Sequence, residues 1–264
     1  HQSLAVGVRE RIRGEVPFAQ LDVVLLRQRA HQPHGLVQHR RQGHRLQREA
    51  LTPSLDARDL QDLVDEVQQV TPRLEDVLDP LGLRRREFAA GRLLARRLLS
   101  ELGVAGSCAV LRGAEREPLW PEGIVGSITH KRGWAAVALA RSSVVCALGC
   151  DLEEDQPLGE DLWRSVLTPA EQRWLRQQAN GGQLAKVCFS AKECFYKAQF
   201  SLTRQWLGFL DVELSIQPGA QPFVAGSFVV EPKCALPALD GRGALTGRYL
   251  VRDGYVATAL SVSA

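Results

Sequence analysis

Two kinds of hydrophobic pattern alternate along this chain. Residues 84–103 (RRREFAAGRLLARRLLSELG) repeat apolar residues near 3.6-residue spacing, which predicts an amphipathic helix ending at Gly103. The same spacing in residues 55–81 predicts one or two further helices that stop near Pro80 and Gly82. Residues 127–140 and 142–154 are instead rich in short apolar and β-branched runs, which is typical of two adjacent strands.

The remaining residues continue this alternation. Residues 167–182 predict a helix that is capped by Thr168 and Glu171 and ends at Gly181 and Gly182. Residues 189–200 predict a second helix, and residues 209–217, 222–230 and 247–263 alternate like antiparallel strands, the last folded at Asp253 and Gly254. The order helix, strands, helices, strands predicts an α+β protein of two similar halves, each a helix packed on a small antiparallel sheet.

Composition supports a folded core and gives no sign of a membrane protein. Of the 264 residues, 45% are hydrophobic, but no apolar run approaches the roughly 20 residues that a membrane span needs. The N-terminus lacks the order of a signal peptide, so we expect a cytoplasmic protein. The six cysteines form no CxxC and no zinc spacing, which predicts free thiols.

Positive charge is concentrated at the N-terminus. Residues 1–50 hold nine arginines against four acids and five of the six histidines, whereas the whole chain has a net charge of only +3. Because no aromatic residues are interleaved in the Gln/Arg/His-rich passage 27–49, we expect a solvated extension rather than an arm that binds nucleic acid. We therefore divide the chain into an atypical, poorly ordered or non-native segment (1–80), an N-terminal half (81–150) and a C-terminal half (151–264).

Two carboxylates end the second predicted strand. Asp151 and Glu153 are two residues apart in GCDLEE, so their side chains share one face of a strand. A close pair of carboxylates suits Mg²⁺, which favours one or two carboxylates together with water and substrate phosphate. Taken alone, the same pattern also fits an ordinary solvent-exposed strand end.

A second polar group lies in FSAKECFYKA. Ser190 is placed to cap the predicted helix, Glu193 is the capping-box acid, and Lys197 follows Glu193 at i+4, so each residue has a structural explanation. The alternative is a half-buried site that handles phosphate through Lys192, Glu193 and Lys197.

A third group lies in PEGIVGSITH. Glycines there allow close backbone approach to a ligand, and Ser127, Thr129 and His130 supply donors for anionic oxygens. Further cations lie in the arginine-rich start of the helix (Arg84, Arg85, Arg86 and Arg92) and at Arg116. Together with the carboxylates, they indicate a metal site and a polyanionic, nucleotide-like substrate.

These motifs, in this order, resemble one known family. GSITH, GCDLEE and FSAKECFYKA are similar to the three signature motifs of the 4′-phosphopantetheinyl transferases. RREFAAGR, REPLWPEG and WLGFLDVEL resemble the subgroup that serves enterobactin-type siderophore synthases, and the resemblance runs from about Arg84 to the C-terminus. It implies two pseudo-twofold-related halves in a monomer, with coenzyme A and the active site between them.

The resemblance also implies a function and roles for individual residues. It implies Mg²⁺-dependent transfer of 4′-phosphopantetheine from coenzyme A to a serine of an apo acyl, peptidyl or aryl carrier protein, with release of 3′,5′-ADP, for siderophore, nonribosomal peptide, polyketide or fatty-acid synthesis. Asp151, Glu153 and Glu193 would bind the metal; Glu193, His130 and Lys197 would be catalytic. The residues implied to bind coenzyme A are Arg85, Arg86, Arg92, Arg116, Ser127, Thr129, His130, Lys192 and Lys197.

Two other functions remain open from the residues alone. A Mg²⁺-dependent phosphohydrolase could use the same acids on a coenzyme A-like or nucleotide substrate without any acceptor protein. A non-catalytic binding module would use its acids only as helix caps and strand ends. The chain also departs from the family at residues 1–80, which do not resemble the strand and loop that complete the first half.

Overall fold

The computed structural model describes residues 7–8, 22–27, 80–104, 109–131, 134–219 and 224–263, with side chains from Glu87 onward. The described helices are α2 (Pro80–Glu101), α3 (Glu160–Val166), α4 (Pro169–Leu175) and α5 (Gly181–Thr203), with the 3-10 turns η3 (Phe209–Asp211) and η4 (Pro237–Leu239). The strands are β1 (Gly7–Val8), β2 (Asp22–Arg27), β3 (Leu111–Arg112), β4 (Pro118–Leu119), β5 (Ile124–Lys131), β6 (Trp134–Arg141), β7 (Val145–Glu154), β8 (Val212–Pro218), β9 (Ala225–Pro232), β10 (Leu245–Arg252) and β11 (Tyr255–Ser263).

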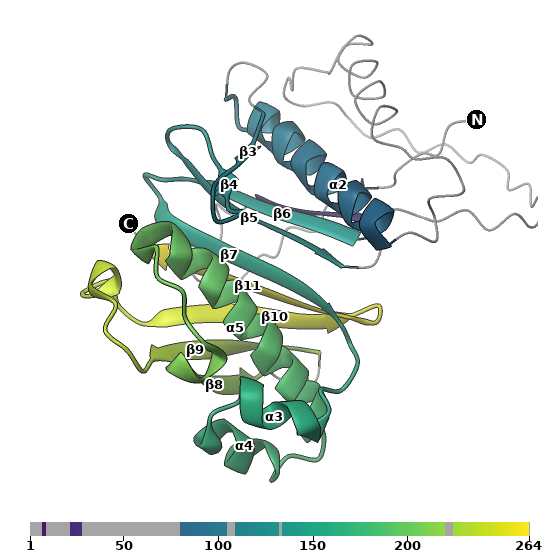
Figure 1. The fold of residues 1–264 in the computed structure, drawn as a ribbon, viewed down its shortest axis with the longest axis vertical. Helices are drawn as coiled ribbons and strands as arrows, with labels where there is room; N and C mark the ends of the chain where they lie inside the picture. The colour runs from purple at the N-terminus through teal and green to yellow at the C-terminus, as the bar shows by residue number, and fades with distance from the viewer. Residues whose placement is uncertain are drawn as a thin grey trace, which may run out of the picture.

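The N-terminal half places one long helix on an antiparallel sheet. Strands follow the order β1-β2-β6-β5, and α2 lies across β5 and β6 (Figure 1). Leu94, Leu98 and Leu99 of α2 are almost fully buried in a core with Val137 and Leu139 of β6. Burying each such leucine contributes roughly 1.5–3 kcal/mol, so the apolar stripe read from the sequence holds α2 on the sheet.

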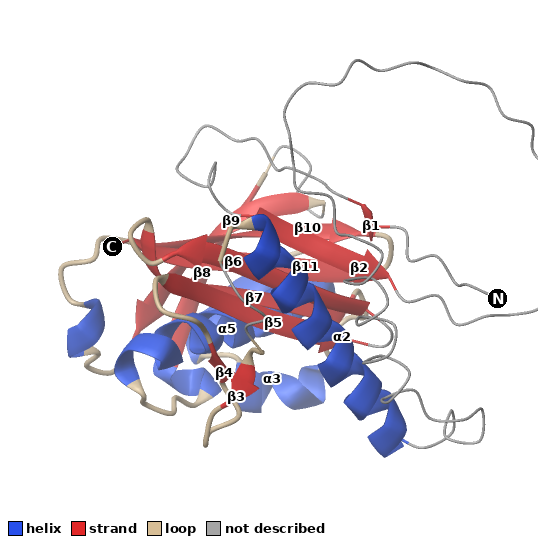
Figure 2. Ribbon diagram, turned by 90° about the horizontal axis from the view of Figure 1, so that it is seen from above, coloured by secondary structure: helices blue, strands red, loops and turns tan. Residues whose placement is uncertain are grey.

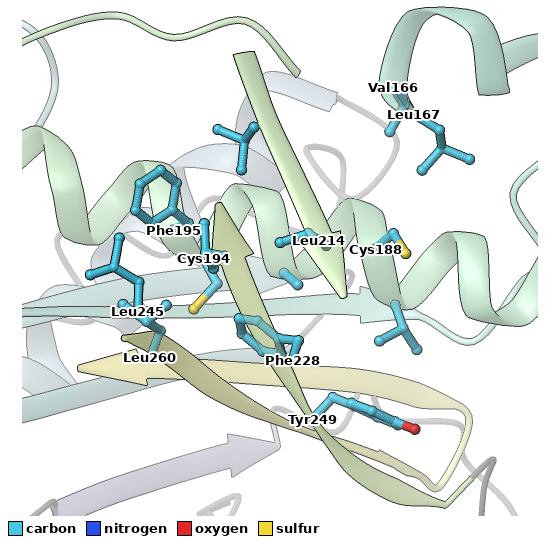
Figure 3. Close-up of a cluster of buried hydrophobic side chains, with 14 of the residues drawn as sticks. Val166, Leu167, Cys188, Cys194, Phe195, Leu214, Phe228, Leu245, Tyr249 and Leu260 are labelled. Carbon is cyan, nitrogen blue, oxygen red and sulfur yellow. The ribbon is translucent and has the colours of Figure 1, made fainter. Parts of the chain in front are cut away.

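The C-terminal half repeats this arrangement with a larger sheet. Its strands follow the order β7-β11-β10-β9-β8, and α5 and α3 lie on the same side of that sheet (Figure 2). Phe195 of α5 packs with Phe228 and Leu260 from the strands (Figure 3). A β-carbon on Gly149 of β7 would lie 2.0 Å from the carbonyl oxygen of Cys194, so only glycine allows α5 to approach β7 this closely.

The two halves meet where β5 lies beside β7. Each is the edge strand of its sheet, and side chains of β5 take the place of a backbone ladder. The Ser127 hydroxyl accepts the N–H of Cys150 at 3.0 Å, and the Thr129 hydroxyl accepts the N–H of Leu152 at 3.2 Å. These bonds satisfy buried backbone groups of β7 and fix the two sheets against each other.

The α+β class, with a helix on an antiparallel sheet in each half, is confirmed. So are the capping box of Thr168 and Glu171, the hairpin turn at Asp253 and Gly254, and the end of α2 near Gly103. The described cysteines are all free thiols, as expected (Cys146, Cys150, Cys188, Cys194 and Cys234). No described helix has the length and hydropathy to cross a bilayer.

Several element boundaries were wrong. The helix from Thr168 ends at Leu175, and α5 begins at Gly181, so Ser190 lies inside a 23-residue helix and caps nothing. Gly181 and Gly182 begin α5 instead of ending the preceding helix. Gly181 is required by close packing, because a β-carbon there would lie 2.5 Å from the carbonyl oxygen of Leu175. Pro80 begins α2 rather than ending a helix.

The segment 1–80 is described only in part. We assigned no strand to it, whereas β2 pairs with β6 and β1 pairs with β2. The helices predicted within residues 55–79 lie outside the described residues. The division into 1–80, 81–150 and 151–264 stays a prediction.

Candidate active site

Asp151 lies at the centre of the junction between the halves. It is only 6% exposed, and its carboxylate accepts hydrogen bonds from Thr129 of β5 at 3.2 Å and from Ser190 of α5 at 2.8 Å. The Lys197 ammonium is 2.6 Å from Asp151 Oδ1 and also donates to the Cys150 carbonyl at 3.1 Å. Both halves therefore hold this carboxylate in one orientation.

Glu193 shares the face of α5 that carries Ser190 and Lys197, because positions i, i+3 and i+7 align on a helix. Burial raises the pKa of the Glu193 carboxyl, and the negative charge of Asp151 raises it further; Lys197 opposes this shift and Glu153 adds to it. Burial is the largest influence on Lys197 and lowers its pKa, but the charge and hydrogen bond of Asp151 together with Cys150 and Cys194 outweigh it, so the pKa of Lys197 is raised. The three carboxylates thus repel one another across a partly buried site.

Glu153 is held by lysines that the sequence interpretation missed. Lys131, the last residue of β5, places its ammonium 2.8 Å from Glu153 Oε2, and Lys186 of α5 lies 3.7 Å from the same oxygen. The available signal was alternation, since Lys131 follows Thr129 by two residues and projects toward β7 with it. The site therefore contains three lysines paired with two carboxylates.

His130 lies on the other face of β5. Its Nδ1 is 3.2 Å from Oε2 of Glu87 on α2, and 39% of its side chain is exposed. Glu87 was not among the predicted site residues, although it lies within the quoted motif RREFAAGR. His130 is thus adjacent in sequence to the Asp151 partner Thr129 but is oriented by the helix of the N-terminal half.

Lys192 was predicted to bind coenzyme A, but the structure places its side chain away from the junction of the two halves. Its side chain is fully buried, 2.8 Å from Glu171 Oε2, and it also donates to the carbonyls of Val166 and Phe209. Five residues along a helix correspond to about 140° of rotation, so Lys192 projects away from the face that carries Lys197. It fastens α4 and η3 to α5 instead.

Ser127 and Thr129 were also predicted as ligand donors, but in the structure their side chains bond within the protein. They are 3% and 5% exposed, and their hydroxyls are used by the backbone of β7 and, for Thr129, by Asp151. Their period-two spacing turns both toward the neighbouring edge strand. They build the site without facing a ligand.

The arginines are less fully described. Arg92 stacks over the Phe88 ring and donates to the Leu111 carbonyl, and burial together with the nearby Arg112 lowers the pKa of its guanidinium. Arg116 lies exposed in the turn between β3 and β4, with a left-handed φ of 71°. Arg85 and Arg86 lie in α2, but their side chains are outside the described set. The assignment of these arginines to coenzyme A stays a prediction.

The residues fit a magnesium ion by chemistry rather than as a ready-made cage. Within the described part of the chain, no three His, Cys, Asp or Glu side chains are gathered closely enough to enclose an ion. Asp151, Glu153 and Glu193 are nevertheless hard oxygen donors within electrostatic reach of one another. Their mutual repulsion is what a divalent cation relieves.

Comparison with known proteins identifies the family. The family model of the 4′-phosphopantetheinyl transferase N-terminal domain matches residues 81–140. The family model of the 4′-phosphopantetheinyl transferase superfamily matches residues 147–245. A 4′-phosphopantetheinyl transferase of Nocardia iowensis is 36% identical over 183 residues, which are 67% of this chain and 82% of that protein. The chain belongs to the 4′-phosphopantetheinyl transferase superfamily.

Other relatives agree with this assignment. A 4′-phosphopantetheinyl transferase of Mycobacterium tuberculosis is 32% identical over 205 residues, covering 75% of this chain and 89% of that protein. Enterobactin synthase component D of Escherichia coli is 34% identical over 134 residues, covering 50% and 61%. The chain is therefore an enzyme of the class that transfers 4′-phosphopantetheine from coenzyme A to a carrier protein.

Proposed function

We propose that this transferase uses Mg²⁺ and coenzyme A to modify a serine of an apo carrier protein, releasing 3′,5′-ADP. The observation that supports the proposal most strongly is the convergence of Asp151, Glu153, Glu193 and Lys197 at the junction of β5, β7 and α5. Enterobactin synthase component D among the relatives supports a carrier protein of siderophore, nonribosomal peptide, polyketide or fatty-acid synthesis as acceptor.

The proposed mechanism requires positioning, charge neutralisation and removal of one proton. The serine oxygen attacks the phosphorus that bears the pantetheine arm, and the bond to the bridging oxygen breaks, so that 3′,5′-ADP leaves with the electron pair. Glu193 takes the serine proton, directly or through water, and its raised pKa makes it a stronger base than an exposed glutamate. Lys197 and His130 bind diphosphate oxygens and stabilise the charge on the leaving group.

Asp151, Glu153 and Glu193 would hold Mg²⁺, which when bound neutralises charge on the diphosphate. The lysines paired with Asp151 and Glu153 would then be freed to contact phosphate oxygens. His130 and Lys131 are consecutive on β5, so their side chains face opposite sides of the strand, with Lys131 on the side of Lys197. A diphosphate bound by both His130 and Lys197 would therefore lie across the end of that strand. The arginines Arg85, Arg86, Arg92 and Arg116 would bind the 3′-phosphate and adenine side.

The test is the mass of an apo carrier protein incubated with enzyme, coenzyme A and Mg²⁺. We expect a gain of one phosphopantetheine group with the wild type and with the control Glu154→Gln, and none with Asp151→Asn. An unchanged mass with the wild type, or an equal gain with Asp151→Asn, would contradict the proposal. Release of 3′,5′-ADP without any acceptor would instead indicate a phosphohydrolase.

We also propose that the enzyme works as a monomer, because α2, the β3–β4 turn, β5, β7 and α5 of one chain supply all the residues assigned above. Light scattering with size-exclusion chromatography tests this, and a stable dimer that retains activity only as a dimer would contradict it.

A further inference from the structure

We propose that Glu87 is a positioning residue that fixes the ring and tautomer of His130. The proposal rests on the function proposed above for the role of His130, but the structural part stands on geometry. Glu87 is 8% exposed, lies on α2 rather than on the strand of His130, and places Oε2 3.2 Å from Nδ1 of that ring. A carboxylate only accepts, so this contact favours the proton on Nδ1.

The packing of α2 on β5 sets this distance. Gly91 follows Glu87 by one helical turn, and Ile128 precedes His130 by two residues, so the two pairs lie in register on facing surfaces. A β-carbon on Gly91 would lie 2.7 Å from Cγ2 of Ile128. Gly91 therefore lets the helix come close enough for Glu87 to reach the imidazole.

The consequence for catalysis follows from the two ring nitrogens. When Nδ1 is held by Glu87, Nε2 is left to bind another group. In the protonated ring both nitrogens donate, so Nε2 can reach a diphosphate oxygen while Glu87 continues to hold Nδ1. Glu87 thus acts on the substrate through His130 without touching it.

A spectroscopic test addresses the tautomer without any assay of activity. The ¹⁵N chemical shifts of His130, assigned by their loss in His130→Gln, should show Nδ1 protonated in the neutral ring of the wild type. Glu87→Ala should shift the population toward the Nε2-protonated form, and the control Glu101→Ala, on the same helix but in an exposed pair with Arg97, should leave it unchanged. A wild-type ring protonated mainly on Nε2 would overturn the proposal.

Kinetics test the consequence for catalysis by a double-mutant cycle. Glu87→Ala should lower kcat/KM for coenzyme A roughly 10- to 100-fold in the wild type, the size expected when a reacting group is misplaced. The same change should cost less than about twofold in the His130→Ala background, since its effect passes through His130. An equal loss in both backgrounds would show a general structural role and overturn the proposal.

Two further variants separate distance from charge. Gly91→Ala should reproduce part of the tautomer shift, because it pushes α2 away from β5. Glu87→Gln keeps an acceptor for Nδ1, so it should retain the wild-type tautomer while lowering kcat/KM less than Glu87→Ala does. If Gln behaves as Ala does in both measurements, the positioning role is wrong. If the wild type modifies no carrier protein, the proposed function fails while the tautomer result still stands or falls on its own.

Discussion

Helix α5 carries two lysine–carboxylate pairs five residues apart that differ in their surroundings. Lys192 is fully buried, and besides Glu171 it bonds two backbone carbonyls, so its three donors are all used. Lys197 is 31% exposed and pairs with Asp151, which lies within electrostatic reach of Glu193. The Lys192–Glu171 pair is sealed from solvent, whereas the Lys197–Asp151 pair keeps a partly exposed charge at the junction of β5, β7 and α5. The same two residue types therefore serve stability in one place and chemistry in the other.

Lys192→Ala is expected to give the largest effect. It leaves Glu171 buried without its cation, which costs about 3–5 kcal/mol of unfolding free energy. Urea denaturation measures it, and Lys192→Met combined with Glu171→Gln should recover part of the loss because the buried charge is gone. A cost for Lys192→Ala below about 1 kcal/mol would remove the contrast between the two lysines.

Lys197→Ala should have the opposite profile. We expect turnover to fall about 100- to 1000-fold, as when one preorganised charge donor is removed. Unfolding free energy should change by no more than about 1 kcal/mol, because this lysine is partly exposed. Paired urea and turnover measurements on the two lysine variants check this, and equal stability losses would contradict the comparison.

Gly149→Ala tests the spacing between α5 and β7, which carries the Lys197–Asp151 pair. The new methyl group would meet the backbone of α5 at Cys194, so we expect a loss of about 1–3 kcal/mol from overpacking. Turnover should also fall, since α5 carries Glu193 and Lys197. Thermal melting with the carrier-protein assay measures both, and a variant as stable and active as the wild type would show that the contact does not set the site.

Arg204→Ala should have the smallest effect. This residue ends α5 in an ion pair with Glu117, 2.6 Å away, but its side chain is 59% exposed. Exposed pairs contribute at most about 1 kcal/mol and weaken with salt. Urea denaturation at low and high salt measures the change in unfolding free energy. A loss as large as that of Lys192→Ala would contradict the expectation that the cost of removing a cation from α5 follows its burial.

Local spacing was enough to predict much of this protein. The 3.6-residue repeat located α2, and short apolar runs located β6 and β7, the second of which carries Asp151 and Glu153 near its end. Asp151 and Glu153 share a strand face, and Glu193 and Lys197 share a helix face. The spacing within each pair could therefore be read from the sequence without knowledge of the tertiary fold.

The errors arose where tertiary contacts decide. Nothing local distinguishes Lys192 from Lys197, because the packing of α3, α4 and η3 on α5 determines which one is buried. The partners of Ser127 and Thr129 could not be read from the sequence, because they lie more than twenty residues away on a neighbouring edge strand. The pairing of Glu87 with His130 likewise depends on how α2 lies on β5. The cytoplasmic location stays a prediction.

The most direct test of the central claim is calorimetric titration of coenzyme A with and without Mg²⁺, for the wild type and Asp151→Asn. If Asp151 and its neighbours hold the ion on the diphosphate, Mg²⁺ should tighten binding to the wild type by at least about tenfold, or about 1.4 kcal/mol, and should have little effect on the variant. An equal gain from Mg²⁺ in both proteins would contradict the account.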